Sequence, residues 1–248
     1  MAIDRRGFLS GLLACPACVA VGYAAEGHHW TYEGETGAAK WGELEPGFKA
    51  CAVGSEQSPI DLTGARRASL DAVKLDWKPQ AYEVVNNGHT IQANAAPGSG
   101  MMLGGEKFEL KQFHFHTPSE HAIDGERLAM EAHFVHAQPS GKLAVIGVFL
   151  IPGRANPAFK ALIGAAPTKE GEAELEKPLD VKALLPKSKA LFRYEGSLTT
   201  PPCSEVVDWI VYEQPVEVAQ KDIDAFKAIF PMNARPLQSI NRRFLLKS

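Results

Sequence analysis

Three histidines in two short alternating segments constrain this chain more than any other feature. The first segment reads Gln112-Phe-His114-Phe-His116, and the second, a hairpin's length later, contains Glu131-Ala-His133. Side chains alternate between the two faces of a β-strand, so His114 and His116 share one face and the intervening phenylalanines share the other. If the segments pair as antiparallel strands, His133 lies beside the first two histidines. The pattern predicts a sheet with one metal-binding face and one packed face.

The residues beside the histidines extend the same two faces. Read backwards at a period of two, the first strand places Phe108 and Leu110 with Gln112 on the histidine face, and the second places Val135 with Glu131. An amide or a carboxylate beside an imidazole can hold its second nitrogen and so fix the ring. We therefore expect Gln112 and Glu131 to orient the metal ligands.

A centre of three neutral imidazoles indicates a catalytic metal. Structural zinc usually has four protein ligands, whereas three leave one tetrahedral position open. A lone histidine in a strand is more often an ordinary core or surface residue, and His-x-His alone is a weak signal. Here the spacing and the flanking polar residues agree, so we expect one zinc ion per chain on His114, His116 and His133. Cobalt or iron also suit such a site under other conditions.

Nearly the whole chain after its first thirty or so residues resembles one family in order. The matching segments are Trp30-Thr-Tyr32, Gln57-Ser-Pro-Ile-Asp61, Asn86-Asn-Gly-His89, the histidine strand, Ser119-Glu-His121, Glu131-Ala-His133-Phe-Val-His136, Leu143-Ala-Val-Ile-Gly147, Gly196-Ser-Leu-Thr-Thr-Pro-Pro202, Trp209 and Asn241-Arg242. They resemble the α-class carbonic anhydrases. The Thr117-Pro118 step after the histidine strand resembles the shorter bacterial branch.

The resemblance implies a reaction, the reversible hydration of carbon dioxide to bicarbonate, and roles for two further residues. Thr199 is expected to accept a hydrogen bond from the zinc-bound nucleophile, while Glu120 holds the Thr199 hydroxyl proton. The chemistry agrees, because an ionised carboxylate only accepts and so fixes that hydroxyl as a donor to itself. The backbone N–H of Thr199 is expected to stabilise charge on the substrate oxygen.

The resemblance also implies a substrate pocket beside the metal. Its expected members are Val135, Val145, Leu198, Thr200 and Trp209. Without the resemblance, Val145 would be an ordinary core residue, because it lies in a continuous apolar run typical of a buried strand.

His89 matches the family's proton-shuttle position. The ordinary pKa of a histidine, about 6.5, lets it accept and release protons near neutrality. The alternative is a plain turn histidine, because Asn86-Asn87-Gly88 is typical of a turn. The resemblance places Tyr32, Asn87 and Gln92 around the water chain that leads to His89, and Gln92 departs from the shorter amide of the best-known members.

Short apolar runs dominate the chain and favour a fold built on strands. They are separated by 22 glycines and 17 prolines, and residues 117–128 contain Asp124-Gly125, which suits the turn between the histidine strands. Helical patterns are few and short, such as residues 221–229. The resemblance implies a mainly β (α+β) single domain over residues 26–248, with a central, mostly antiparallel twisted sheet of about ten strands and short peripheral helices.

Residues 1–25 have the order of a twin-arginine export signal. Arg5-Arg6 precede an apolar stretch with small residues near its end, which predicts cleavage between Ala20 and Ala25 and a periplasmic or secreted protein. Cys15 allows a second interpretation, a lipoprotein box that would anchor the chain through that cysteine. We expect no transmembrane segment, because no apolar run approaches the roughly 20 residues that a spanning helix needs.

Cys51 and Cys203 remain once the cysteines of the signal are removed. An even pair in an exported chain is a candidate disulfide, and exported members of the family bridge these regions. Two buried free thiols are the alternative.

The net charge of -3, without a basic stripe, argues against nucleic-acid binding.

Taken together, the histidine pattern and the resemblance predict a zinc-dependent carbonate dehydratase (a lyase) with a small-molecule substrate. Two rivals share the fold: a zinc-binding module without catalysis, and a zinc hydrolase of small esters.

Overall fold

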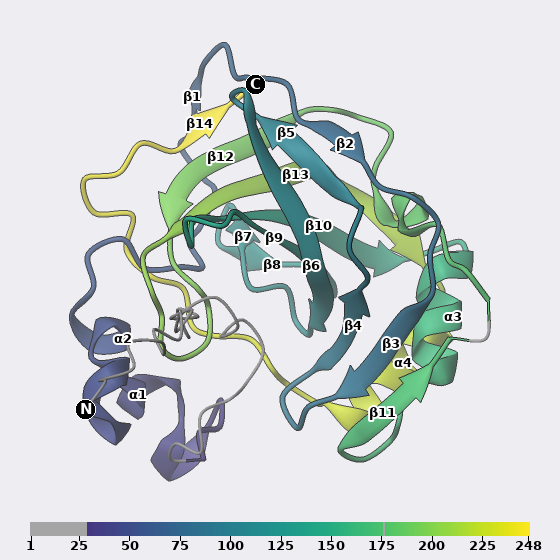
Figure 1. The fold of residues 1–248 in the computed structure, drawn as a ribbon. Helices are drawn as coiled ribbons and strands as arrows, with labels where there is room; N and C mark the ends of the chain where they lie inside the picture. Colours follow the sequence, from purple (N-terminus) through teal and green to yellow (C-terminus); the bar gives the residue numbers. More distant parts are fainter. Residues whose placement is uncertain (1–28, 176) are drawn as a thin grey trace, which may run out of the picture.

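One mixed sheet dominates the computed structural model, which describes residues 29–175 and 177–248 (Figure 1). The sheet has twelve strands, and its main path runs β1-β14-β12-β13-β10-β9-β6-β4-β3-β11, with β5 beside β6 and β2 beside β5. Its strands are β1 (Arg66–Arg67), β2 (Lys74–Asp76), β3 (Tyr82–Asn86), β4 (Ile91–Ala95), β5 (Gly100–Leu103), β6 (Glu106–His116), β9 (Met130–Ala137), β10 (Leu143–Pro152), β11 (Gly171–Glu174), β12 (Leu191–Gly196), β13 (Val207–Val218) and β14 (Leu246–Lys247). The mainly β expectation is confirmed. Most pairings are antiparallel, and β10–β13 and β1–β14 are parallel.

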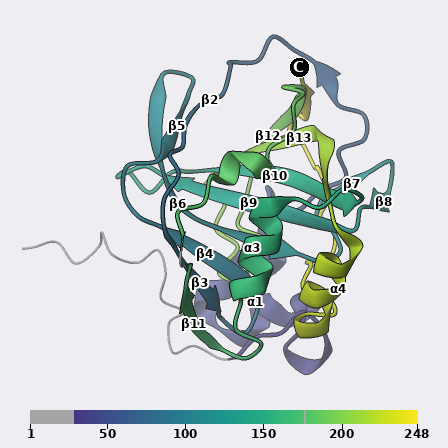
Figure 2. The same ribbon diagram turned by 90° about the vertical axis from the view of Figure 1, so that its right-hand side faces the viewer.

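Two helices cover one face of the sheet. Figure 2 shows α3 (Pro157–Ala165) and α4 (Gln220–Ile229) side by side on it, and α4 matches the helix expected over residues 221–229. Asn156 caps α3, since its side-chain oxygen accepts from the Ala158 and Phe159 amides. The remaining helical turns are α1 (Trp41–Leu44), α2 (Ala50–Val53) and the 3-10 turns η2 (Gly34–Thr36), η3 (Ala38–Lys40), η4 (Pro46–Phe48) and η5 (Val181–Leu184). Among the described residues, no helix combines the length and apolar character needed to cross a membrane.

The two faces of the sheet carry separate apolar clusters. Phe115 of β6 packs against Phe159 of α3 and Phe226 of α4, with ring centroids 5.1 and 6.3 Å apart. The opposite face holds a second cluster that includes Val135 and Trp209. The phenylalanines of the histidine strand therefore anchor it to the helices, which leaves the histidines on the other face.

One expectation about the histidine strand was wrong. Phe108 and Leu110 are both about 1% exposed and belong to the helix-covered cluster with Phe113, not to the histidine face. The pairing of β6 with β9 shifts register between Leu110 and Gln112, so Lys111 is an extra residue in the strand. A β-bulge of this kind interrupts the alternation of faces, and residues before it change sides relative to residues after it.

The connection between the histidine strands forms the turn that its sequence indicates. Strands β7 (Ala122–Ile123) and β8 (Glu126–Arg127) make a small hairpin. Its turn residues Asp124 and Gly125 have φ of 53° and 79°, the left-handed region that this dipeptide tolerates. The Gly125 amide donates to the Asp61 carboxylate at 2.9 Å, which ties the hairpin to the preceding loop.

The predicted disulfide between Cys51 and Cys203 is confirmed. It joins α2 to the loop after β12, across 152 positions of the chain, and both cysteines are buried beside Trp41. The Cys203 amide donates to the carbonyl of the predicted pocket residue Thr200 at 2.9 Å. The cross-link therefore fixes the loop that carries Thr199 and Thr200. The expected export signal, with Arg5, Arg6 and Cys15, lies outside the described residues.

Candidate metal centre

Strand pairing brings the three predicted ligands together. In the antiparallel register of β6 and β9, His114 lies opposite His133, and His116 lies opposite Glu131. One ring nitrogen from each of the three histidines lies within 4.8 Å of the others. His116 and His133 are almost fully buried, while His114 is partly exposed and forms the open side.

Two of the rings are oriented through their Nδ1 atoms. His114 Nδ1 lies 2.8 Å from the Gln112 side-chain oxygen, and His116 Nδ1 lies 2.7 Å from the Asn233 carbonyl oxygen. Both oxygens are acceptors, so each Nδ1 carries a proton and donates. In a neutral ring this leaves Nε2 with a free lone pair.

The protonation of these rings suits a metal ligand. Burial lowers the pKa of His114 well below its ordinary value and also lowers that of His116, so both rings are neutral near pH 7. His116 Nε2 is buried and has no hydrogen-bond partner among residues 29–175 and 177–248. A buried nitrogen of this kind is costly unless something binds it. A cation held by the three imidazoles would satisfy it, and a set of three imidazoles suits zinc.

Glu131 organises the third histidine. Its Oε1 lies 2.8 Å from His121 Nδ1 and 3.1 Å from His133 Nε2, and its Oε2 accepts from the amides of Glu120 and His121. Burial raises the pKa of Glu131, but His121 and His133 outweigh burial and hold it well below its usual range. The resulting carboxylate lies beside His133 Nε2, which makes no hydrogen bond of good geometry within the described residues. His121, Glu131 and His133 also cluster closely, and there His121 Nδ1 is already hydrogen-bonded to Glu131 Oε1.

Glu120 lies beside His116 and His133. It is fully buried, and its Oε1 accepts from the Arg235 amide at 2.8 Å. Its Oε2 has no hydrogen-bond partner and lies 3.5 Å from His116 Nε2 and 3.8 Å from His133 Nδ1. Thr199 is also buried, and the described residues show no hydrogen bond between its hydroxyl and Glu120. One oxygen of Glu120 is thus free to accept.

The predicted apolar wall forms a row across three strands. Val145 of β10 lies opposite Val135 of β9 on one side and Trp209 of β13 on the other. The Trp209 ring contacts His133, with centroids 4.8 Å apart. Leu198 packs against the same cluster from the loop after β12. The sheet therefore places a continuous apolar surface next to the histidines.

His89 lies in the turn between β3 and β4, half-buried against an aromatic ring. Its imidazole stacks on Trp30, with centroids 3.7 Å apart and planes 7° from parallel, and His29 lies 6.1 Å away. Burial lowers the pKa of His89, as does His29, while Glu170 raises it.

Two of the three residues expected around the water chain are engaged with the protein. The Asn87 side-chain oxygen accepts from the amides of His89 and Thr90 and so builds the turn. Gln92 lies opposite His114 in the register of β4 and β6, and its amide donates to Asn94 at 2.7 Å. Tyr32 packs edge-on against Trp30 and lines, with His89, a hollow of about 270 Å³.

Two residues of the centre were missed by the sequence analysis. Asn233 acts on His116 through its backbone carbonyl, which no side-chain pattern reveals. Arg235 is about 1% exposed, and its guanidinium donates to Gln57 and to the Ser58 and Cys51 carbonyls. Burial lowers the pKa of Arg235 to about 10. Both residues lie in an irregular segment after α4, where periodicity gives no signal.

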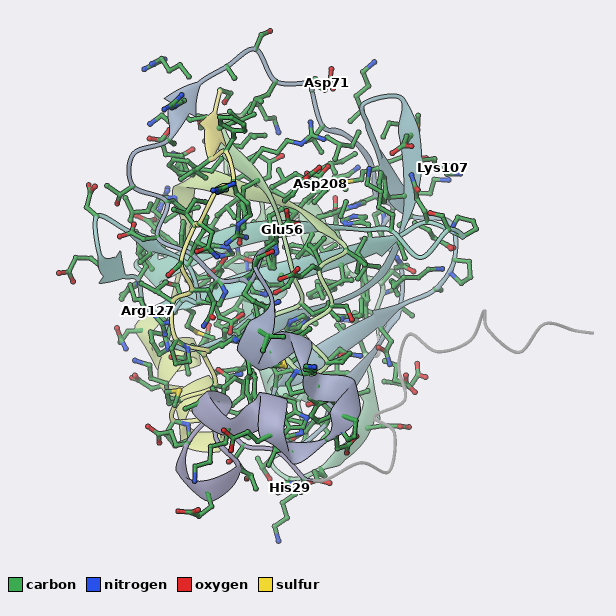
Figure 3. All side chains as sticks on the ribbon, turned by 90° about the vertical axis from the view of Figure 1, so that its left-hand side faces the viewer. His29, Glu56, Asp71, Lys107, Arg127 and Asp208 are labelled. Carbon is green, nitrogen blue, oxygen red and sulfur yellow. A yellow bond between two sulfur atoms is a disulfide. The ribbon has the colours of Figure 1, made fainter. Side chains whose placement is uncertain are left out.

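A larger hollow lies away from the histidines. Its volume is about 840 Å³, and its lining includes Glu56 and Asp208, which are labelled in Figure 3, but none of the three candidate ligands. In that view His29 lies toward the opposite, lower end of the molecule. The volume of a hollow alone would therefore not identify the three-histidine site.

Comparison with known proteins agrees with the geometry. The family model for eukaryotic-type carbonic anhydrases matches residues 36–248. The carbonic anhydrase of Pectobacterium carotovorum is 40% identical over 243 residues, 97% of this chain and 99% of that protein, and that of Nostoc sp. is 41% identical over 239 residues, 94% of this chain and 90% of that protein. The α-carbonic anhydrase of Thermovibrio ammonificans, solved with the inhibitor sulfanilamide, superposes with a TM-score of 0.86 at 40% identity, covering 88% of this chain and 98% of that one. The chain belongs to the α-class, or eukaryotic-type, carbonic anhydrase family.

Proposed function

We propose that His114, His116 and His133 hold one zinc ion and that the chain uses it to interconvert carbon dioxide and bicarbonate. The observation that carries the proposal is the buried Nε2 of His116, which has no hydrogen-bond partner among the described residues and lies where the three imidazoles converge. When bound, zinc supplies Lewis acidity that makes water a nucleophile near neutral pH, a property for which carbonic anhydrase is itself the standard example.

The protein's own groups would orient the attacking water. Glu120 Oε2 is a free, buried acceptor, and the Thr199 hydroxyl is the donor we assign to it. With its proton held there, the Thr199 oxygen presents a lone pair to the attacking water and so fixes the direction of attack. The Thr199 backbone N–H would stabilise charge that develops on the substrate oxygen.

The row of Val135, Val145 and Trp209, with Leu198 and Thr200 from the adjoining loop, would hold carbon dioxide. An apolar surface suits an uncharged substrate and offers no hydrogen bond that would retain water in its place.

His89 would carry the released proton to solvent. Its partly exposed ring lines the 270 Å³ hollow, and its lowered pKa favours the neutral form that accepts a proton. Tyr32, Asn87 and Gln92 would border the connecting waters. Because Asn87 and Gln92 already bond to protein groups, we assign them a smaller effect than Tyr32.

Metal content tests the zinc assignment without reference to activity. Elemental analysis of the purified protein should give about one zinc per chain, and His133→Ala should hold much less after the same dialysis. Lys142→Ala, on an exposed side chain, is the matched control and should retain zinc. A wild-type protein that takes up no zinc after dialysis against the metal would contradict the assignment.

Two rival functions would use the same three histidines. A binding module would keep zinc and show no hydration, while an ester hydrolase would show a larger kcat/KM for an activated ester than for carbon dioxide. The free Glu120 acceptor and the uninterrupted apolar wall favour carbon dioxide.

We further propose that residues 1–25 export the domain formed by residues 26–248 to the periplasm or beyond. The buried Cys51–Cys203 disulfide supports an oxidising compartment. Replacing Arg5 and Arg6 together by lysine should block export, and unchanged periplasmic activity would refute a twin-arginine signal. Palmitate labelling would instead support an anchor at Cys15.

A further inference from the structure

Asn233 bonds to two separate segments of the candidate centre. Its side-chain nitrogen donates to the carbonyls of His89 at 3.0 Å and Phe115 at 2.9 Å. Its side-chain oxygen accepts from the Thr117 amide at 2.7 Å, and its own carbonyl accepts from His116 Nδ1. With about 1% of its surface exposed, Asn233 makes these bonds out of reach of bulk water. One residue thus contacts the histidine strand and the turn of His89.

The end of β6 explains why a side-chain amide suits position 233. Strand β4 pairs with β6 only from Gln112 to His114, so the Phe115 carbonyl and the Thr117 amide extend beyond the ladder. Buried backbone groups of this kind must find other partners. An asparagine side chain has the donor and acceptor of a peptide group, and Asn233 supplies both. Its side chain therefore makes the hydrogen bonds that β4 would make if its pairing with β6 continued past His114.

The chemistry of the site allows few substitutes for Asn233. Its nitrogen faces two carbonyl oxygens, so an aspartate would bring a third acceptor against them, and an alanine would remove these bonds from two buried backbone groups and one partly buried one. The Thr90 hydroxyl also reaches the Phe115 carbonyl at 2.5 Å, but it contacts neither Thr117 nor the His89 carbonyl in the described residues. Two side chains thus link the turn to the histidine strand: Thr90 bonds to the amide and the carbonyl of Phe115, and Asn233 also reaches the Thr117 amide and the His89 carbonyl.

We propose that Asn233 is a positioning residue that fixes the metal ligand His116 and the shuttle turn of His89 relative to each other. The inference rests on the proposed function, because it assumes zinc at His116 and proton transfer at His89. A proton passes between fixed groups through ordered hydrogen bonds, so a small shift between ligand and shuttle slows the transfer even when both residues are intact. The same shift loosens the His116 ring and speeds metal loss.

Asn86 provides a matched control. It is the buried last residue of β3, where that turn begins, and its side chain donates to the Pro167 carbonyl and accepts from the Gly88 amide. It makes no side-chain bond to β6 in the described residues. Asn86→Ala therefore disturbs the shuttle turn without touching the metal-ligand strand.

The experiment compares the zinc-loaded wild type with Asn233→Ala and Asn86→Ala in two assays. The first is zinc release to a chelator in excess, and the second is carbon dioxide hydration at low and at high imidazole buffer, where imidazole replaces an internal shuttle. Asn233→Ser, which keeps one hydroxyl, serves as the variant if Asn233→Ala does not fold.

The proposal expects Asn233→Ala to release zinc about ten times faster or more, within the range seen for groups that orient metal ligands. Its kcat at low buffer should fall more than kcat/KM, and imidazole should restore part of the loss. Asn86→Ala should release zinc at the wild-type rate. Wild-type zinc release by Asn233→Ala, or an equal loss of kcat and kcat/KM without response to imidazole, would overturn the inference. A wild type without zinc or hydration would instead refute the proposed function itself.

Discussion

Val145 lies directly opposite Trp209 where the parallel strands β10 and β13 pair, and both side chains are about 2% exposed. A bulky residue at position 145 would therefore occupy the apolar surface beside His133. We expect Val145→Tyr to lower kcat/KM for carbon dioxide by about 100-fold, the scale of a misplaced substrate, while zinc content stays unchanged. Ile146→Val, one position along and on the opposite face, is the control, and it should cost about 1 kcal/mol of stability with kcat/KM intact. An equal kcat/KM for Val145→Tyr and the wild type would show that carbon dioxide does not bind against this apolar surface.

The pKa of His89 should respond to His29 and Glu170 in opposite directions. His29 lowers this pKa and Glu170 raises it, in addition to the lowering by burial. His89 accepts a proton only when neutral, so the acid limb of kcat for hydration should lie below the ordinary histidine value of about 6.5. His29→Ala should move the limb to higher pH and Glu170→Gln to lower pH. NMR titration of the His89 ring checks both shifts, and movement in the opposite sense would refute the electrostatic account.

Acid should destabilise the fold through His136. Its Nε2 accepts from the Trp77 indole at 3.1 Å, which requires a neutral ring, and burial lowers its pKa to about 4. The unfolded chain binds this proton near pH 6.5, so stability is complete above that value and falls as the pH drops toward 4. The loss amounts to about 3 kcal/mol. Urea unfolding at several pH values measures it, and His136→Gln, which can accept from Trp77 without titrating, should show a smaller pH dependence. An unchanged pH dependence in that variant would contradict the assignment.

The disulfide should contribute strongly to stability. Closing a loop of 152 positions stabilises by about 5 kcal/mol in the chain-entropy model, an upper figure because denatured chains retain structure. We expect the double variant Cys51→Ser with Cys203→Ser to unfold at clearly lower urea and to lose activity, because the cross-link holds the loop that carries Thr199 and Thr200. Reduced wild type should behave like the variant. Identical midpoints with and without reductant would show that the bond is unimportant.

The histidine cluster could be predicted because it depends on a local rule. A period of two in each strand and one antiparallel pairing are enough to bring His114 and His133 together, and the structure has that register. The mainly β fold followed from the same kind of pattern, together with the resemblance to a known family. Both depend on features that short stretches of sequence carry.

The errors and omissions arise where local rules stop. The bulge at Lys111 places Phe108 and Leu110 on the opposite face from the one predicted. A lysine is not typical of a bulge, so the sequence carried no signal of it. Asn233 orients His116 across 117 positions through a backbone carbonyl, which every residue possesses. Such contacts are set by the packing of distant segments and become visible only in the folded chain.

Stopped-flow hydration of carbon dioxide by the purified protein, with zinc removed and then restored stoichiometrically, tests the central claim most directly. We predict that activity disappears with the metal, returns in proportion to zinc up to about one ion per chain, and does not return in His133→Ala. Full zinc occupancy at the three histidines without hydration above the uncatalysed rate would contradict the account.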